Sequence, residues 1–257
     1  MIAVIVPIYN TEKYLRETID SVICQTLSFA EHIRLILLDD ASTDGSFAIC
    51  EQYQKQYPKQ ILVKHYDTNQ GVSVLRNEGV RIAGEMGDEL ITFLDSDDKL
   101  ADDAMEKAVQ YFDAHEDVFV AAIGIRYFDA YEGEQRLNWR FEKTDVVDIK
   151  KDYTYPHYYV GGVFLRHAVL DELHFDESLS FWEDALAVNQ VIVSQGKYGL
   201  IAGTHYTIER EKMNLLLSIR HGIKKSVIQR CYRLVMDSYL PTQGKSTIVL
   251  FLMCSTW

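Results

Sequence analysis

The sequence predicts an α/β fold in which a mostly parallel β-sheet carries helices on both faces. Short β-rich runs alternate with segments of helical period through the first half of the chain, which is typical of strand–helix–strand units. Polar and acidic residues follow the end of each run, where open parallel sheets bind their ligands. The chain has 257 residues, of which 47% are hydrophobic and 25% are charged. It therefore suits one large globular domain, or a domain with an appendage.

The elements can be assigned in order along the chain. Strands are expected at 3–8, 33–38, 61–65, 90–94 and 118–125. After each of the first four strands, apolar residues recur at helical spacing, namely Leu15, Ile19, Val22 and Ile23; Phe47, Cys50, Tyr53 and Tyr57; Val72, Leu75 and Ile82; and Ala104, Ala108 and Phe112. Beyond Arg126 the pattern becomes irregular and aromatic, until a helix near 182–195 and a strand near 198–208.

The composition excludes several classes of protein. With 26 Lys and Arg against 38 Asp and Glu, the net charge of −12 would repel a polyanion, so no nucleic acid partner is expected. The four cysteines show no Cys-x-x-Cys spacing, which indicates reduced thiols and no zinc site. The apolar run at 2–8 does not resemble a signal peptide, and the run at 248–254 is far shorter than the ~20 residues of a membrane-spanning helix. We therefore expect a cytoplasmic protein.

Acidic residues cluster directly after the fourth predicted strand, in Asp95-Ser96-Asp97-Asp98. Asp95 and Asp97 are two positions apart, so in an extended chain their side chains point to the same side. Paired carboxylates of this kind suit a Mg²⁺ or Mn²⁺ ion that also binds substrate phosphates. The alternative is structural, because Asp97 or Asp98 could cap a helix that begins near Leu100.

The second predicted strand leads into Asp39 and Asp40. A carboxylate at a strand end can accept the N–H of a uracil or the hydroxyls of a ribose, as the acidic residue does in dinucleotide-binding folds. Ser42 or Thr43 could equally cap a helix. We expect both, with Asp40 in nucleotide binding and the two hydroxyl residues at the start of the next helix.

The third motif runs from Asn69 to Gly79. Gly71 is expected to open a helix, and Arg76 lies five residues further on, from where it could reach a phosphate or a ribose across the cleft. The alternative is a surface helix with a solvated arginine.

The fourth motif is Trp182-Glu183-Asp184 at the start of the helix expected near 182–195. Acids in a first helical turn are common because they stabilise the helix dipole. A tryptophan beside paired acids could also supply a face that stacks on a sugar together with a general base. The motif alone leaves both interpretations open.

Together the motifs resemble those of the family 2 glycosyltransferases, which have the GT-A fold. The matching segments occur in that family's order: Val4 to Asn10, Asp39-Asp40, Asn69 to Gly79, Asp95-Ser96-Asp97 and Glu183-Asp184. The match covers about residues 2–215. Within the family, residues 175–179 running into Glu183-Asp184 are most similar to bacterial enzymes that build or decorate surface polysaccharides and teichoic acids.

The resemblance implies a Rossmann-like GT-A domain over 1–215, with 1–125 binding the nucleotide sugar and 126–215 the acceptor. Implied nucleotide-sugar contacts are Pro7, Tyr9, Asn10, Asp40, Asn69, Gly71, Arg76, Asp95 and Ser96. Asp97, together with Asp95, would ligate Mn²⁺ or Mg²⁺. Asp184, beside Glu183, would be the catalytic base. Candidates for a loop over the diphosphate or for the acceptor site are His205, Arg210 and Trp182.

The implied activity is an inverting transfer of a sugar from a nucleotide sugar, most simply a UDP sugar, to a hydroxyl of a glycan or polyol acceptor. A nucleotidyltransferase is disfavoured because the polar turn at 9–12 stands where its glycine-rich basic loop would follow the first strand. A non-catalytic nucleotide-sugar-binding module is disfavoured because binding alone needs neither a base nor a pair of metal acids.

Residues 216–257 are expected to form a helical C-terminal extension with a truncated or altered end. Its basic helix at 219–236 could contact an anionic membrane or a teichoic polymer at the inner face of the cell membrane, although a solvated face is the simpler interpretation. Its apolar residues could be covered by a missing segment or by a second subunit in a homo-oligomer. The aromatic region at 139–159 does not identify the sugar or the acceptor.

Overall fold

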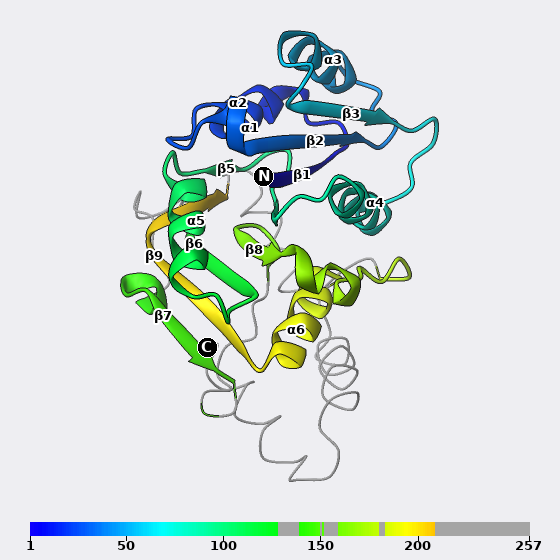
Figure 1. Cartoon of the computed structure of the whole chain (residues 1–257). Helices are drawn as coiled ribbons and strands as arrows, with labels where there is room; N and C mark the ends of the chain where they lie inside the picture. Colours follow the sequence, from blue (N-terminus) through cyan, green and yellow to red (C-terminus); the bar gives the residue numbers. More distant parts are fainter. Residues whose placement is uncertain (128–138, 150, 152–158, 180–182, 209–257) are drawn as a thin grey trace.

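The computed structural model describes residues 1–127, 139–149, 151, 159–179 and 183–208. In these ranges the chain forms one β-sheet with helices on both faces (Figure 1). The elements follow in the order β1 (Ile2–Ile8), α1 (Glu12–Ile23), α2 (Phe29–His32), β2 (Ile33–Asp39), α3 (Ser46–Gln56), β3 (Ile61–His65), α4 (Val72–Glu85), β4 (Leu90–Phe93), β5 (Lys99–Leu100), α5 (Ala104–Ala114), β6 (Val120–Tyr127), η1 (Trp139–Glu142), β7 (Asp145–Asp148), β8 (Val163–Arg166), η2 (His167–Glu172), α6 (Glu183–Gln195) and β9 (Lys197–Ile208).

The sheet has a parallel half and a mixed half. Strand β1 pairs in parallel with β2 on one side and with β4 on the other, and β2 pairs in parallel with β3. The full order is β3-β2-β1-β4-β8-β6-β9-β5, with β7 beside β9. Strand β8 is antiparallel to β4 and to β6, whereas β6 and β9 are parallel. The predicted fold class is confirmed, and the parallel arrangement is uninterrupted only among β1 to β4.

The side chains of β1 alternate between two hydrophobic cores. Val4 and Val6 belong to the core under α1, α3 and α5, and Ala3 and Ile5 to the core under α4 and α6. Helix α4 lies directly on β1, because a Cβ atom added to Gly79 would be 2.3 Å from Cγ2 of Ile5. Burying an aliphatic side chain contributes about 1.5–3 kcal/mol, so this alternation fixes the register of the strand.

Strands β1 and β4 separate at their carboxyl ends. The pairing ends with Ile5 opposite Phe93, and Pro7, which has no N–H to donate, lies beyond that point, opposite Leu38 of β2. The strand order also reverses here, since the chain passes from β1 to β2 on one side and reaches β4 on the other. Open α/β sheets bind ligands at such a switch point.

The predicted start of the helix after the second strand was wrong, because the loop that follows β2 forms hydrogen bonds with the loop that follows β1. Ser42 and Thr43 do not begin the second helix; α3 begins at Ser46. The hydroxyl of Ser42 instead accepts the backbone N–H of Asn10, and the N–H of Thr43 donates to the side-chain oxygen of Asn10. These residues therefore shape the loop beside the pocket.

The structural alternative for the acidic motif after the fourth strand is also wrong. Asp97 and Asp98 do not cap a helix near Leu100, because Lys99–Leu100 forms β5 and pairs with β9. Helix α5 begins only at Ala104. The acidic residues therefore belong to a turn between two strands.

Within the described ranges, no helix is long and apolar enough to cross a bilayer. The predicted C-terminal extension at 216–257, with its membrane and subunit contacts, lies outside the described residues. The boundary between 1–215 and that extension stays a prediction.

Candidate active site

A pocket of about 500 Å³ lies at the switch point, within the ~300–1,000 Å³ typical of small-molecule sites. It is lined by Pro7, Ile8, Tyr9, Asp40, Asn69, Gly71, Val72, Leu75, Arg76, Asp95, Ser96 and Asp97. These residues lie at the end of β1, in the segments that follow β1, β2 and β4, or in the first turns of α4 and the loop before it. The pocket thus brings together every residue predicted to bind the nucleotide sugar except Asn10.

Asn10 shapes the rim of the pocket instead of lining it. Its φ of 53° lies in the left-handed region, which asparagine tolerates better than most residues. Its backbone N–H lies 3.0 Å from the hydroxyl of Ser42, and its Oδ1 atom accepts the N–H of Thr43 at 2.8 Å. Asn10 therefore ties the loop after β1 to the loop after β2.

The carboxylate of Asp40 holds the loop that leads into α4. Its Oδ1 atom accepts the backbone N–H of Gln70 at 2.6 Å, and its Oδ2 atom accepts that of Gly71 at 2.9 Å. Gly71 begins α4 as predicted, and its φ of 93° favours glycine. Each carboxylate oxygen keeps further acceptor capacity, so Asp40 can also bind a donor group of a ligand.

Asp39 has a structural role that differs from that of Asp40. It is fully buried, and its Oδ2 atom lies 2.7 Å from Nδ1 of His65 and 3.2 Å from the backbone N–H of Ser42. Asp39 therefore braces β2 against β3 and the following loop. Of the two acids, only Asp40 lines the pocket.

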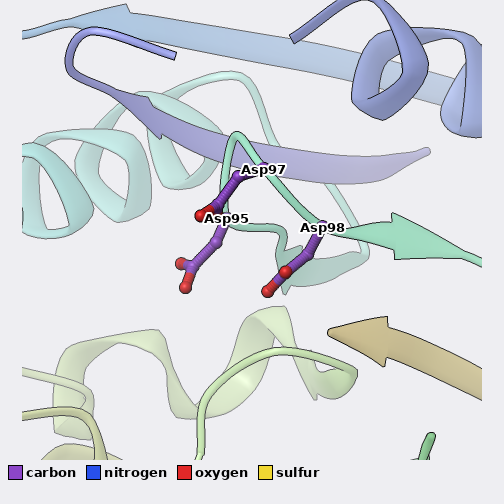
Figure 2. A group of neighbouring side chains, drawn as sticks. All are labelled: Asp95, Asp97 and Asp98. Carbon is purple, nitrogen blue, oxygen red and sulfur yellow. The ribbon is translucent and has the colours of Figure 1, made fainter. Parts of the chain in front are cut away.

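Three acids share the turn after β4. Figure 2 shows Asp95, Asp97 and Asp98 on this turn, with the side chains of Asp95 and Asp98 directed to the same side. One carboxylate oxygen from each lies within 4.8 Å of the others. Oxygen donors at this spacing fit Mg²⁺ or Mn²⁺. Asp98 was considered only as a possible helix cap in the alternative interpretation, so its place in this group was missed.

Two tyrosines from distant segments hold Asp98, which is itself fully buried. The hydroxyl of Tyr206 on β9 donates to Oδ2 of Asp98 at 2.8 Å, and the hydroxyl of Tyr159 lies 2.8 Å from the same atom. Burial and the nearby carboxylates raise the pKa of both tyrosines well above the ordinary value. Both hydroxyls are therefore protonated donors at neutral pH. Sequence reasoning missed both residues.

Arg76 is a buried link between the pocket and α6, not a solvated surface residue. It is 4% exposed, and its Nη2 atom lies 3.1 Å from Oδ1 of Asp95 while Nη1 lies 2.9 Å from Oε1 of Glu183. Burial disfavours its charge, but the carboxylates of Asp95, Asp184 and Glu183 more than compensate and raise its pKa. Within the described residues, its Nε atom is buried without a hydrogen-bond partner.

Asp184 is the partly buried neighbour of this arginine in the first turn of α6. Loss of hydration raises its pKa to about 6, although the charge of Arg76 opposes the shift. Glu183 and Asp95 add to the rise through charge repulsion. A carboxylate with this pKa is ionised at neutral pH and more basic than an exposed aspartate, as a general base requires.

The remaining predicted contacts are not in the pocket or are not described. Trp182 and Arg210 lie outside the described residues. His205 precedes Tyr206 on β9, so its side chain lies on the opposite face of the strand. Burial and the charge of Arg126 lower the pKa of His205, which does not line the pocket.

Comparison with known proteins agrees with the order of these motifs. Residues 3–174 match the model of the family described as "Glycosyl transferase family 2". The chain is 39% identical over 246 residues to the minor teichoic acid biosynthesis protein GgaA of Bacillus subtilis (strain 168), covering 93% of this chain and 55% of GgaA. It is 37% identical over 215 residues to GgaB of the same organism, covering 81% of this chain and 23% of GgaB. The chain therefore spans about half of one relative and a quarter of the other.

Among solved structures, S. aureus TarS 1-349 in complex with UDP-GlcNAc matches with a TM-score of 0.69 at 24% identity. The match covers 81% of this chain and 59% of that one. It shows that the two chains share the GT-A fold. Since the family match extends from β1 through the acidic turn to η2, this chain belongs to glycosyl transferase family 2.

Proposed function

We propose that this chain is the catalytic unit of a glycosyltransferase that moves a sugar from a UDP sugar to a hydroxyl of a glycan or polyol acceptor. The product would be part of a cell-surface polymer such as teichoic acid, as the names of GgaA and GgaB suggest. One observation carries the proposal: Arg76 joins the acidic turn of the pocket to the first turn of α6, where Asp184 has the pKa of a general base.

The donor would lie along the carboxyl ends of β1, β2 and β4. Tyr9 is 51% exposed at the pocket and offers a ring face for a nucleobase. The carboxylate of Asp40 only accepts hydrogen bonds, which favours a base such as uracil that presents an N–H. UDP-GlcNAc bound to TarS supports this class of donor.

The oxygen donors of Asp95 and Asp97 fit Mn²⁺ or Mg²⁺ and line the pocket where the diphosphate would lie. Such an ion, when bound, supplies positive charge that stabilises the leaving diphosphate. Arg76 places a buried guanidinium beside Asp95. The metal and the arginine together would offset the negative charge of the chain at this point.

Asp184 would remove the proton from the acceptor hydroxyl. The acceptor oxygen then forms a bond to the anomeric carbon as the bond from that carbon to the diphosphate oxygen breaks, and the electron pair leaves with UDP. Because attack comes from the face opposite the diphosphate, a single displacement inverts the anomeric configuration. Alignment of the two substrates supplies much of the remaining acceleration.

A UDP-release assay over several nucleotide sugars, with Mn²⁺ and with EDTA, tests the proposal. We expect release from one donor, lost in EDTA and in Asp97→Ala, and unchanged in Asp113→Ala, which alters an exposed acid on α5. UDP binding without turnover of any donor would instead identify a non-catalytic binding module. Absence of UDP binding would overturn the nucleotide site itself.

A further inference from the structure

The acidic turn is held from outside the pocket by two tyrosines. The hydroxyl of Tyr206 accepts the backbone N–H of Asp95 at 3.1 Å and donates to Oδ2 of Asp98 at 2.8 Å. The hydroxyl of Tyr159 lies 2.6 Å from Oδ2 of Asp95 and 2.8 Å from Oδ2 of Asp98. Both ends of the turn shown in Figure 2 are therefore fixed by groups that do not line the pocket.

Neighbouring residues leave space for the rings of Tyr159 and Tyr206. They pack edge to face, with centroids 5.5 Å apart and an interplanar angle of 73°. A Cβ atom added to Gly161 would lie 2.4 Å from Cε1 of Tyr159 and 2.5 Å from Cζ of Tyr206, so a larger residue would displace both rings. The pairing of β5 with β9 places Leu100 opposite Tyr206 and so fixes the ring relative to the turn.

A third contact holds the turn from α1 and does not involve a carboxylate. The hydroxyl of Thr18 on α1 donates to the backbone oxygen of Ser96 at 3.0 Å. Threonine therefore fixes the backbone of the turn, whereas the tyrosines also orient its acids. Tyr206 contacts both the backbone and a carboxylate of the turn, and Tyr159 contacts two of its carboxylates.

We propose that Tyr206 and Tyr159 are positioning residues that orient Asp95 and Asp98 so that the turn presents a preformed site for a divalent cation. The inference rests on the proposed function, which places a metal at Asp95 and Asp97. A hydroxyl that fixes one carboxylate oxygen leaves the other oxygen in a defined direction, which lowers the entropic cost of ion binding. Loss of such outer contacts typically weakens metal binding about 10–100-fold.

Tyr206→Phe and Tyr159→Phe test the inference, because each removes a hydroxyl and keeps the ring. The matched control is Tyr111→Phe, which removes a buried hydroxyl that donates to the backbone oxygen of Asp145, away from the acidic turn. Free Mn²⁺ is measured by electron paramagnetic resonance during titration of each protein in the presence of UDP. UDP affinity in EDTA and thermal unfolding are measured on the same samples.

We expect each of the two variants to bind Mn²⁺ about tenfold more weakly than the wild type, with UDP affinity in EDTA unchanged within about twofold. Excess Mn²⁺ should restore turnover in both variants, and Tyr111→Phe should bind Mn²⁺ as the wild type does. Wild-type Mn²⁺ affinity in Tyr206→Phe and Tyr159→Phe would overturn the inference and leave the proposed function intact. Failure of the wild type itself to bind Mn²⁺ would overturn both the metal site and the inference.

Discussion

Arg76 and Glu183 are 107 residues apart in the sequence, and in the structure Nη1 of Arg76 lies 2.9 Å from Oε1 of Glu183. The same guanidinium contacts Asp95 at 3.1 Å. One buried cation thus sits between the acids of the nucleotide pocket and the acids of α6. The relative position of the proposed metal site and the proposed base is set by this side chain.

Removing the charge of Arg76 should lower the stability of the folded protein. Arg76→Met leaves buried carboxylates without their partner, and we expect the free energy of unfolding to fall by about 3–5 kcal/mol. Urea denaturation at pH 8 measures the change. Arg81→Met is the control, because it breaks ion pairs of an exposed arginine on the same helix and should cost less than about 1 kcal/mol. Equal losses in the two variants would contradict a special role for Arg76.

The transfer rate should report the ionisation of Asp184. Since burial raises its pKa to about 6 and only the ionised form accepts a proton, kcat/KM should rise tenfold per pH unit below about pH 6 and level off above it. Asp184→Asn should lower kcat about 10²–10⁴-fold and leave UDP affinity unchanged. It should also abolish the rise of kcat/KM with pH below about pH 6. A variant that keeps the wild-type pH profile would exclude Asp184 as the base.

The same residue should make the folded protein less stable at neutral pH. The pKa of Asp184 is higher in the folded state than its ordinary value of 3.8, so the contribution of this group to stability is fully present below about pH 4 and is lost as the pH rises through about 6. At pH 8 we expect Asp184→Asn to be up to about 3 kcal/mol more stable than the wild type, and at pH 4 to be nearly equal to it. Urea denaturation at both pH values tests the sign, with exposed Asp113→Asn expected to change neither.

Asn77 should hold the segment that precedes α6. Its Nδ2 atom donates to the backbone oxygen of Phe175 at 2.9 Å and its Oδ1 atom accepts the backbone N–H of the same residue at 2.9 Å. Asn77→Ala leaves both backbone groups unpaired and should cost about 1–3 kcal/mol in thermal or urea unfolding. Exposed Gln110→Ala should change stability by less than about 0.5 kcal/mol. A loss that small in Asn77→Ala would show that water replaces the side chain.

Local patterns were enough to predict the pocket but not its supports. The alternation of apolar runs with helical segments predicted the four parallel strands, and the residues after them line the pocket. Strand β5 was missed because two residues carry no periodic signal, and β7 and β8 were missed because they lie beyond Arg126, where strand-like and helical segments no longer alternate. Asn10 was assigned to the pocket because nothing local indicates its bonds to Ser42 and Thr43.

The contacts that organise the acids depend on long-range pairing. Tyr206 is 108 residues from Asp98, and Tyr159 is 61 residues from it, so no spacing rule relates them. Two weak signals were available. The period-2 pattern of the last predicted strand places Tyr206 on one face, and Gly161-Gly162 indicates a close approach by large side chains. Neither signal indicates that the tyrosines contact Asp98.

The attachment of the acidic turn to β9 has a consequence for how the chain is synthesised. The ribosome completes the turn at residue 98, but the tyrosine that holds it on β9 is added 108 residues later. Until then the nascent chain carries the three acids and β5 without the strand that pairs with β5 and without Tyr206. A fragment that ends near residue 125 would keep the pocket residues and lose both tyrosines, so its acidic turn would lack the contacts that orient Asp95 and Asp98.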